Sequence, residues 1–408
     1  MRGRSRHRGN GDASRLVIRI LCGPQGGIFR KRLQDHAQGG PESDGERQDF
    51  TMRSPNLAER VPLRPTVSVI MANYNCAAYL ADAIRSIQGQ SLRDLEIIVS
   101  DDASRDDSVR IVTELMAEDP RIRLVRGERN GGPAAARNRA LSLAKGEWIA
   151  VMDSDDLMHP DRLTTLVEVA RRDNADMVAD NLLAFDTNGS KPPRPLLSGR
   201  WAREPFWVEI CRYIQLNDFY GRGPGLGYLK PLFRKTILTG PTACYDETLR
   251  IAEDYNLVLR LLYAGRQMRV YPLPLYFYRK HGASISHRLN EMALEALKAT
   301  DVQFLGTISR ENQAIAEAVK RRMKSIETAL AFEKLLNALK SRNWAAAIRI
   351  ALTKPRAAAL LRLPLGVRLR GLAPLRVPRI TLPHPLVLTR SRLSHENQRG
   401  TRRTTNPS

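Results

Sequence analysis

Between residues 66 and 156, short apolar runs rich in β-branched residues alternate with stretches whose apolar residues recur at helical spacing. Runs of the first kind are typical of strands buried on both faces, and the stretches between them of helices that cover a sheet. The alternation predicts βαβ units and a mostly parallel, Rossmann-like α/β sheet. The expected strands are 66–75, 95–102, 121–128 and 147–156, and the expected helices are 77–90, 106–119 and 131–146.

Beyond residue 156 the alternation loosens, although apolar patterning continues. Two loops rich in Pro and Gly interrupt it, at 187–200 and 220–231. We expect the sheet domain to cover residues 65–289 and a helical C-terminal extension to cover 290–341. Within the domain, a further strand is expected at 175–186, a helix near 160 and another at 250–264.

Nearly all of the formal net charge of +22 comes from the two ends of the chain. Residues 1–64 carry a balance of +6, and residues 334–395 hold 13 Lys and Arg but no acid, whereas residues 65–333 amount to only +1. A nearly neutral centre argues against a nucleic-acid-binding protein, a class that the basic composition alone would suggest. Residues 1–64 are expected to be a disordered basic extension, with Met52 as an alternative start.

Residues 342–408 interleave apolar side chains with arginines, a composition that suits peripheral contact with an anionic membrane. The alternative is a disordered basic tail, because its prolines forbid one long helix. The chain has no apolar run of the roughly 20 residues that a spanning helix needs. Four scattered cysteines argue against a zinc site or a disulfide framework and fit a reducing, cytoplasmic setting.

Polar residues gather where the predicted strands end, at Asn73, Asp101–Asp102 and Asp153–Asp156. In open parallel sheets, ligands bind beyond the carboxyl ends of the strands. Three aspartates within four positions would repel one another without a counter-charge. The alternative is a solvated acidic turn that caps the next helix, but such a turn needs one Asp, so a binding role is favoured.

Asp254 lies in the predicted helix at 250–264, on the same face as Leu257, Val258 and Leu261. A carboxylate on a buried face is costly unless it faces a polar cavity or a partner. Such a position favours a raised pKa and therefore suits a general base. A charge at the helix start, favoured by the helix dipole, is the alternative and explains Glu253 equally well.

Five motifs follow one another in order: "VSVIMANYN", "IIVSDDAS", "NGGPAAARNRAL", "DSDD" and "AEDYNLVLRLLYAG". In this order they resemble family 2 glycosyltransferases, which have the nucleotide-sugar-binding GT-A fold. The resemblance covers roughly residues 66–287. Within the family, these stretches are most similar to transferases that extend the lipid-linked repeat unit of the exopolysaccharide succinoglycan.

The resemblance implies a metal and a nucleotide sugar at the acidic cluster. Asp153 and Asp155 match the family's DxD motif, which implies Mn²⁺ or Mg²⁺ bound by Asp155 with Asp153 as a second ligand. Asp153 and Asp156 would contact the ribose or water in the shell of the metal. A divalent cation suits this position because it neutralises the charge that grows on a departing diphosphate.

Other positions acquire donor-binding roles by the same resemblance. Asp101 and Asp102 match the position where a carboxylate contacts the uracil and ribose of the donor, and Asp102 best matches the uracil contact. Capping of the next helix is the structural alternative. Arg137 would face the diphosphate or lie on the surface. His281 is a further candidate near the donor phosphates, although a lone His is more often structural. The residues expected to border the donor pocket through backbone groups and ring stacking are Ala72, Asn73 and Tyr74.

Asp254 matches the family's catalytic base. The implied reaction is an inverting transfer of one glucose from UDP-glucose to a hydroxyl of a lipid-linked oligosaccharide, in exopolysaccharide biosynthesis at the cytoplasmic face of the inner membrane. The QxxRW motif of processive members is absent, which indicates that one sugar is added per acceptor. The alternatives are lipopolysaccharide or capsule synthesis, a basic nucleic-acid-binding protein, and a non-catalytic sugar-nucleotide binder.

Overall fold

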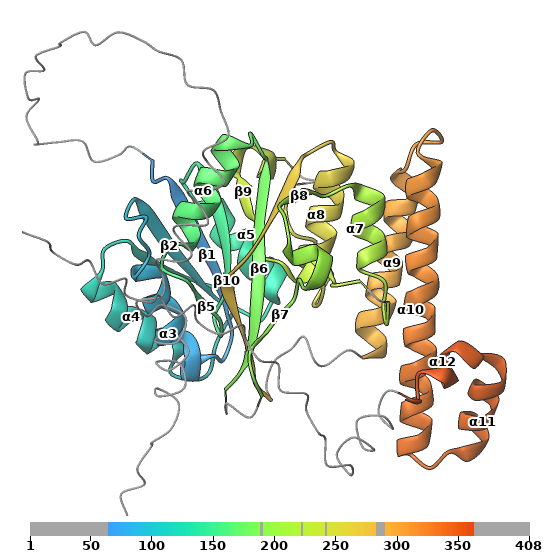
Figure 1. The fold of residues 1–408 in the computed structure, drawn as a ribbon. Helices are drawn as coiled ribbons and strands as arrows, with labels where there is room; N and C mark the ends of the chain where they lie inside the picture. The colour runs from blue at the N-terminus through green and yellow to red at the C-terminus, as the bar shows by residue number, and fades with distance from the viewer. Residues whose placement is uncertain (1–63, 188–190, 222, 241–242, 283–289, 363–408) are drawn as a thin grey trace, which may run out of the picture. The chain divides into compact units, whose positions relative to one another are not determined.

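The structure, a computed structural model, describes residues 64–187, 191–221, 223–240, 243–282 and 290–362. At its centre is one mixed sheet with the strand order β3-β2-β1-β4-β9-β6-β10-β5, in which β7 pairs with β6 and β8 with β10 (Figure 1). The expected N-terminal extension, including Met52, lies outside the described residues, as do residues 363–408 of the expected tail.

The first half of the sheet is parallel, as the sequence predicts. The strands β1, β2, β3 and β4 lie next to one another in the same direction, and the register pairs Asn73 with Asp101 and Ala72 with Asp153. The predicted polar residues therefore reach one edge of the sheet together. The bounds are β1 (Val67–Asn73), α3 (Ala77–Gln88), β2 (Leu95–Asp101), α4 (Ser108–Glu118), β3 (Ile122–Arg126), α5 (Pro133–Leu143) and β4 (Trp148–Asp153).

The second half of the sheet adds antiparallel strands that periodicity does not reveal. The short strand β9 (Leu232–Arg234) runs antiparallel between β4 and β6 (Met177–Asp186). Strand β10 (Met268–Lys280) is parallel to β6 and antiparallel to β5 (Leu157–Met158). Because β5 follows β4 directly, this pairing brings the end of β10 close to the acidic cluster that ends β4.

Short elements and helices complete the sheet domain. Helix α6 begins where the sequence suggests, close to Pro160, whereas α7 falls in a stretch with no expected element. The positions of these elements are α6 (Arg162–Arg172), β7 (Arg194–Pro195), η1 (Gly199–Ala202), β8 (Phe206–Trp207), α7 (Ile210–Leu216), η2 (Leu226–Tyr228), η3 (Lys235–Leu238) and α8 (Glu253–Tyr263).

The core is built from the inner strands and the helices that cover them. Every residue of β1 except Ala72 is buried, and β4 is buried except for Asp153 at its end. The apolar core continues from the sheet into the helical extension, where Ala318 and Val319 pack against it. The strands are therefore fixed by burial on both faces, and their polar ends are held in place by that packing.

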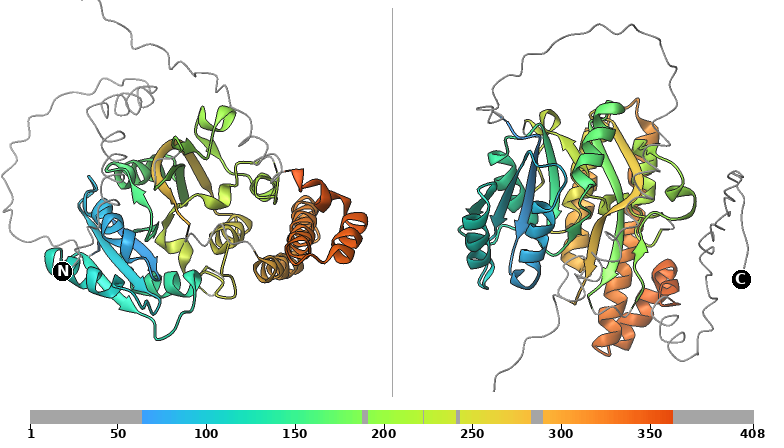
Figure 2. Two further views of the ribbon diagram at one scale, coloured as in Figure 1. Left: turned by 90° about the horizontal axis from the view of Figure 1, so that it is seen from below. Right: turned by 60° about the vertical axis from the view of Figure 1, so that its left-hand side comes forward.

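The helical extension is observed as α9 (Glu291–Thr307) and α10 (Gln313–Lys340), followed by α11 (Trp344–Thr353) and α12 (Pro355–Ala359). Helix α10 packs against α7 and α9, on the α7–α8 side of the sheet (Figures 1 and 2). The first residues of the expected tail are thus helical, with a break at Pro355. Among the described residues, no helix combines the length and apolar character needed to cross a membrane.

Candidate active site

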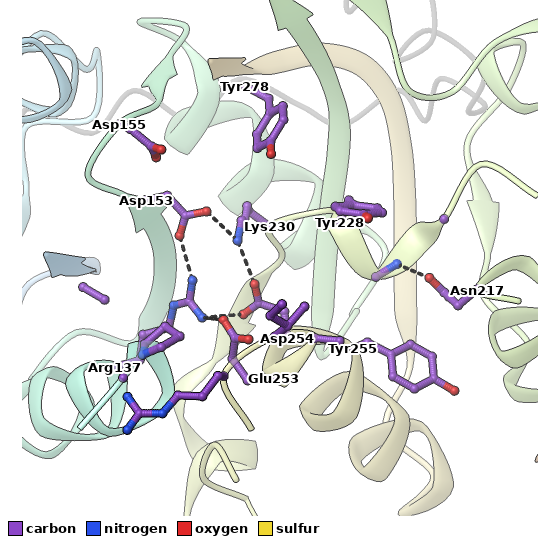
Figure 3. A pocket seen from close by; sticks show the side chains of 18 of the residues that line it. Arg137, Asp153, Asp155, Asn217, Tyr228, Lys230, Glu253, Asp254, Tyr255 and Tyr278 are labelled. Carbon is purple, nitrogen blue, oxygen red and sulfur yellow. Dashed lines mark hydrogen bonds and ion pairs between the residues drawn. The ribbon is translucent and has the colours of Figure 1, made fainter. Parts of the chain in front are cut away.

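A pocket of about 970 Å³ opens at the carboxyl ends of β1 and β4 and is closed on its other side by the start of α8 and the segment 216–230 (Figure 3). Most of the residues that the sequence predicts for the site line this one pocket. They are Ala72, Asn73, Tyr74, Asp102, Arg137, Asp153, Asp155, Asp254 and His281. The two exceptions are Asp101 and Asp156, which lie behind its wall.

Asp101 and Asp102, at the end of β2, make different contacts. Asp101 is buried and accepts hydrogen bonds from the Asn73 side chain at 2.8 Å and from the Ser104 backbone at 3.0 Å. Instead of the predicted donor contact, the structure gives Asp101 a framework role, because its oxygens hold β1 and the following turn together. Asp102 does line the pocket, and the backbone amides of Gly131 and Gly132 donate to its carboxylate at 3.1 and 2.7 Å.

Arg137 lies inside the protein, so the surface alternative left open by the sequence is wrong. It projects from α5 with 3% of its surface exposed. Its guanidinium pairs with Glu253, with Asp153 at 2.7 Å and with Asp254 at 3.3 Å. Burial alone would lower the pKa of Arg137, but the carboxylates, Asp254 first, raise it well above its usual value. A permanent positive charge therefore lies between the DxD motif and the predicted base.

Lys230 is a second buried cation at the same place, and the sequence analysis missed it. Its Nζ lies 2.7 Å from Asp153 Oδ2 and 2.7 Å from Asp254 Oδ2, so it bridges the two carboxylates (Figure 3). The desolvation that would lower the pKa of Lys230 is outweighed by these carboxylates, and the pKa is raised. The main-chain carbonyl of Lys230 accepts a 2.6 Å hydrogen bond from buried Arg162, which fixes the backbone that carries the ammonium group.

Asp153 faces these cations and not the other aspartates of the cluster. Burial would raise the pKa of Asp153, but Lys230 and Arg137 hold it below its ordinary value, so the carboxylate is charged. Each of its oxygens pairs with one cation, while 24% of its side chain remains exposed. The predicted second metal ligand is thus an ion-pair partner in this arrangement.

The Asp155 side chain lies apart from Arg137 and Lys230, as Figure 3 shows. Its Oδ2 lies 2.9 Å from His281 Nε2, and the His281 ring packs against Tyr79 with ring centroids 4.6 Å apart. In the sequence, His281 is a lone histidine for which no partner is predicted. The β5–β10 pairing is the reason it comes to the DxD motif across 126 positions of sequence.

Asp156 is fully buried and turned toward β10. It accepts hydrogen bonds of 2.7 Å from the Tyr276 hydroxyl and from the Arg279 backbone amide. Burial, followed by the nearby Asp155 and Asp153, raises the pKa of Asp156 well above its ordinary value. The predicted ribose or water contact is replaced by a structural one, since both oxygens are used to join the end of β4 to β10.

Asp254 and Glu253 form the first turn of α8, directly after Ala252, whose φ of 62° lies in the left-handed region. Non-glycine residues rarely take this conformation, and those that do often lie at functional sites. Glu253 pairs with Arg137, as suits a charge at the helix start, and Asp254 lines the pocket, where its role as a base stays a prediction. Two cations contact Asp254, whereas the sequence predicted only an apolar face beside it.

Among the described residues, no three His, Cys, Asp or Glu side chains are arranged to bind a metal on their own. Asp155 and His281 nevertheless converge on the pocket as a pair of donor atoms. Mg²⁺ and Mn²⁺ sites in phosphate-binding enzymes commonly use one or two protein ligands, with phosphate oxygens and water for the rest. Asp155 and His281 are two candidate ligands of this kind.

The family description "Glycosyl transferase family 2" matches residues 68–237. The succinoglycan biosynthesis protein ExoO of Rhizobium meliloti is 35% identical over 309 residues, which cover 76% of this chain and 87% of ExoO. The chain belongs to glycosyl transferase family 2. ExoU of the same organism, also named a succinoglycan biosynthesis protein, is 30% identical over 71% of this chain and 84% of its own length.

This family 2 glycosyltransferase also has a distant structural likeness to Staphylococcus aureus TarS in complex with UDP-GlcNAc. The TM-score is 0.49, with 20% identity over 70% of this chain and 90% of that one. The likeness is too remote to bear on the donor. The sequence-based family prediction is confirmed by the family match and by ExoO and ExoU.

Proposed function

We propose that this glycosyltransferase is an inverting, metal-dependent and non-processive enzyme that moves glucose from UDP-glucose to a hydroxyl of a lipid-linked oligosaccharide. The observation that carries this proposal is the position of Asp254, which faces the DxD motif across one pocket and is joined to it by Lys230 and Arg137. A base and a diphosphate site must stand on opposite sides of the anomeric carbon for a single displacement. The names of ExoO and ExoU support exopolysaccharide synthesis as the setting.

In the proposed reaction Asp254 accepts the proton of the acceptor hydroxyl as the oxygen attacks the anomeric carbon. The new carbon–oxygen bond forms on the face opposite the bond to UDP, which breaks, so the configuration inverts. Arg137 and Lys230 lie between the two ends of the pocket, where they can stabilise the charge that develops on the leaving diphosphate. Both cations are held before the reaction by buried carboxylates, so little reorganisation is needed.

The metal would be held by Asp155 and His281. When bound, Mn²⁺ or Mg²⁺ would act as a Lewis acid on the diphosphate. The pairing of both Asp153 oxygens with cations supports a division of labour in this chain, in which Asp153 orders the two cations while Asp155 contacts the ion. Asp102, with Tyr74, Asn73 and Ala72 nearby, remains our proposal for the uridine end of the pocket.

We place the enzyme at the cytoplasmic face of the inner membrane, in contact with anionic lipid. Helix α11 supports this because Trp344, Ile348 and Leu352 follow one another at i, i+4 and i+8, and each leaves at least 60% of its surface exposed. The helix belongs to the stretch that contains 13 basic residues and no acid. An exposed apolar stripe beside uncompensated positive charge is the composition of an interfacial helix.

A panel of nucleotide sugars tests the donor and the metal. We expect UDP release from UDP-glucose with Mn²⁺, and loss of it with EDTA. Asp155→Ala should lower turnover about 100-fold or more, the effect of removing one group that stabilises transition-state charge. Asp106→Ala is a matched control, since Asp106 is an aspartate outside the pocket. Full activity of Asp155→Ala in EDTA would contradict the metal assignment, and release from no UDP-sugar would contradict the function.

A further inference from the structure

The pocket continues beyond the catalytic carboxylates, away from the DxD motif. Its far part is lined by residues 216–221, 223–225, 227 and 228, by Tyr255 and by Arg322 of α10. In Figure 3, Tyr228 and Asn217 lie on the opposite side of Lys230 from Asp153 and Asp155. The donor occupies the DxD side in the proposed function, so this far part is the space left for an acceptor.

Tyr228 presents an aromatic surface in that space. It lines the pocket with 55% of its surface exposed, although it is a large and partly apolar side chain. One part of its ring packs against Gly225, where an added Cβ would lie 3.1 Å from a ring carbon. Gly225 has a φ of 70°, so the turn that places it under the ring favours glycine. The ring is therefore supported by the protein and still open to a ligand.

The backbone that carries Tyr228 is fixed against the catalytic helix. The amide of Gly227 donates to Asn217 Oδ1 at 2.7 Å, and Asn217 Nδ2 donates to the Tyr213 carbonyl at 2.7 Å. Gly227 packs so closely on Tyr255 that an added Cβ would lie 3.0 Å from the Tyr255 Cβ. Tyr255 follows Asp254 directly, so the platform and the base belong to one rigid unit.

We propose that Tyr228 is the stacking platform for the sugar ring that carries the attacking hydroxyl. The ligand class is a pyranose with a flat C–H face, such as a β-glucoside, whose substituents are equatorial and whose axial hydrogens can lie on an aromatic ring. Aromatic side chains supply much apolar contact area from a rigid ring and commonly line ligand pockets. The inference rests on the proposed function, because it assigns the far part of the same pocket to the acceptor.

Saturation-transfer NMR tests this with the UDP- and Mg²⁺-loaded full-length protein, since Mg²⁺ is diamagnetic, and methyl β-D-glucopyranoside as the probe. In the wild type we expect stronger transfer to one set of axial hydrogens, H-1, H-3 and H-5 or H-2 and H-4, than to the other. Tyr228→Ala should weaken binding of the glucoside about three- to tenfold, the range expected for one aromatic contact. Tyr228→Phe, which keeps the ring, should retain it.

Trp207→Ala is the matched control, because Trp207 is also an exposed aromatic residue but lies on β8, outside the pocket. It should leave the glucoside signal unchanged. Calorimetric titration of UDP into the same proteins, prepared without nucleotide, distinguishes failure of the platform from failure of the proposed function. If UDP binds while Tyr228→Ala matches the wild type, or while the wild type shows no transfer to the glucoside, the platform is refuted and the proposed function stands. If UDP does not bind the wild type, the proposed function itself fails.

Discussion

At the scale of single residues, the site depends on alternating charges that neutralise one another. Three carboxylates, Asp153, Glu253 and Asp254, share two cations, Arg137 and Lys230, and all five side chains are mostly or fully buried. Removal of one member leaves a buried charge without its partner, which is costly. Substitutions here must therefore be judged against their effect on folding as well as on catalysis.

Asp254→Asn should remove the base and keep the shape of the site. We expect kcat to fall by about 100- to 10,000-fold, the contribution of general-base catalysis, while affinity for the UDP-sugar stays nearly unchanged. The measurements are steady-state kinetics and donor titration, with circular dichroism to verify folding. Donor affinity that fell in step with kcat would indicate a structural role for Asp254.

Lys230→Met should act differently because the bridging cation contacts both sides of the pocket. We expect a loss in kcat of about 100-fold together with weaker UDP binding, since a buried donor to the leaving diphosphate is removed. Lys230→Arg should recover part of both quantities. A matched control is Lys235→Met: the Lys235 ammonium group donates to the Ala144 carbonyl, outside the pocket. Unchanged UDP affinity in Lys230→Met would oppose the proposed phosphate contact.

At the scale of elements, α11 allows a specific prediction about membrane binding. Replacing Trp344, Ile348 and Leu352 by Ser should reduce binding to anionic vesicles, and binding of the wild type should weaken as salt rises, because the Debye length is about 8–10 Å near physiological ionic strength. Vesicle co-sedimentation measures both. The triple variant should still release UDP. Equal binding to neutral and anionic vesicles would contradict the electrostatic contribution to membrane binding.

Another element-scale feature is β10, which carries the chain back to the acidic cluster. Its Tyr276 and Arg279 hold Asp156, and the chain then continues to His281. The antiparallel pairing with β5 makes this arrangement possible. Each of the three aspartates thus contacts its own set of partners, among them His281, the proposed metal ligand. Their adjacency in sequence does not give them a shared function.

At the scale of the whole molecule, the helical extension is part of the folded unit that contains the pocket. Arg322 of α10 is buried, pairs with Asp301 of α9, and lies 3.9 Å from the centre of the ring of Tyr255, the residue that follows the proposed base. We expect Arg322→Ala to lower the free energy of unfolding by about 3–5 kcal/mol, since Asp301 would remain buried without its partner. Chemical denaturation measures this.

The exposed pair Lys320–Glu317 on the same helix provides a control for Arg322→Ala. Lys320→Ala breaks an ion pair too, but both side chains are more than half exposed, so the change should fall within about 0.5 kcal/mol. Equal effects of the two substitutions would show that the extension contributes little to the stability of the unit that contains the pocket.

The parallel half of the sheet, the family and most of the predicted pocket residues could be inferred from the sequence. Strands buried on both faces and helices with one apolar face leave direct periodic signals, and parallel strands bring their carboxyl ends to one edge. Asn73, Asp102, Asp155 and Asp254 could therefore be found before any coordinates. Their side chains were expected at one site, and they line one pocket.

Which charged side chains contact one another can be seen only in the folded structure. Lys230 and His281 lie in segments without periodicity and reach the site only through β9 and β10, whose pairing depends on contacts far apart in sequence. The tertiary structure also separated Asp156 from Asp155, because Asp155 lies in the turn after β4 whereas Asp156 directly precedes β5 and accepts hydrogen bonds from β10. A residue type in a motif predicts the chemistry that is available; which partner it uses depends on distances of a few ångströms that only the folded chain sets.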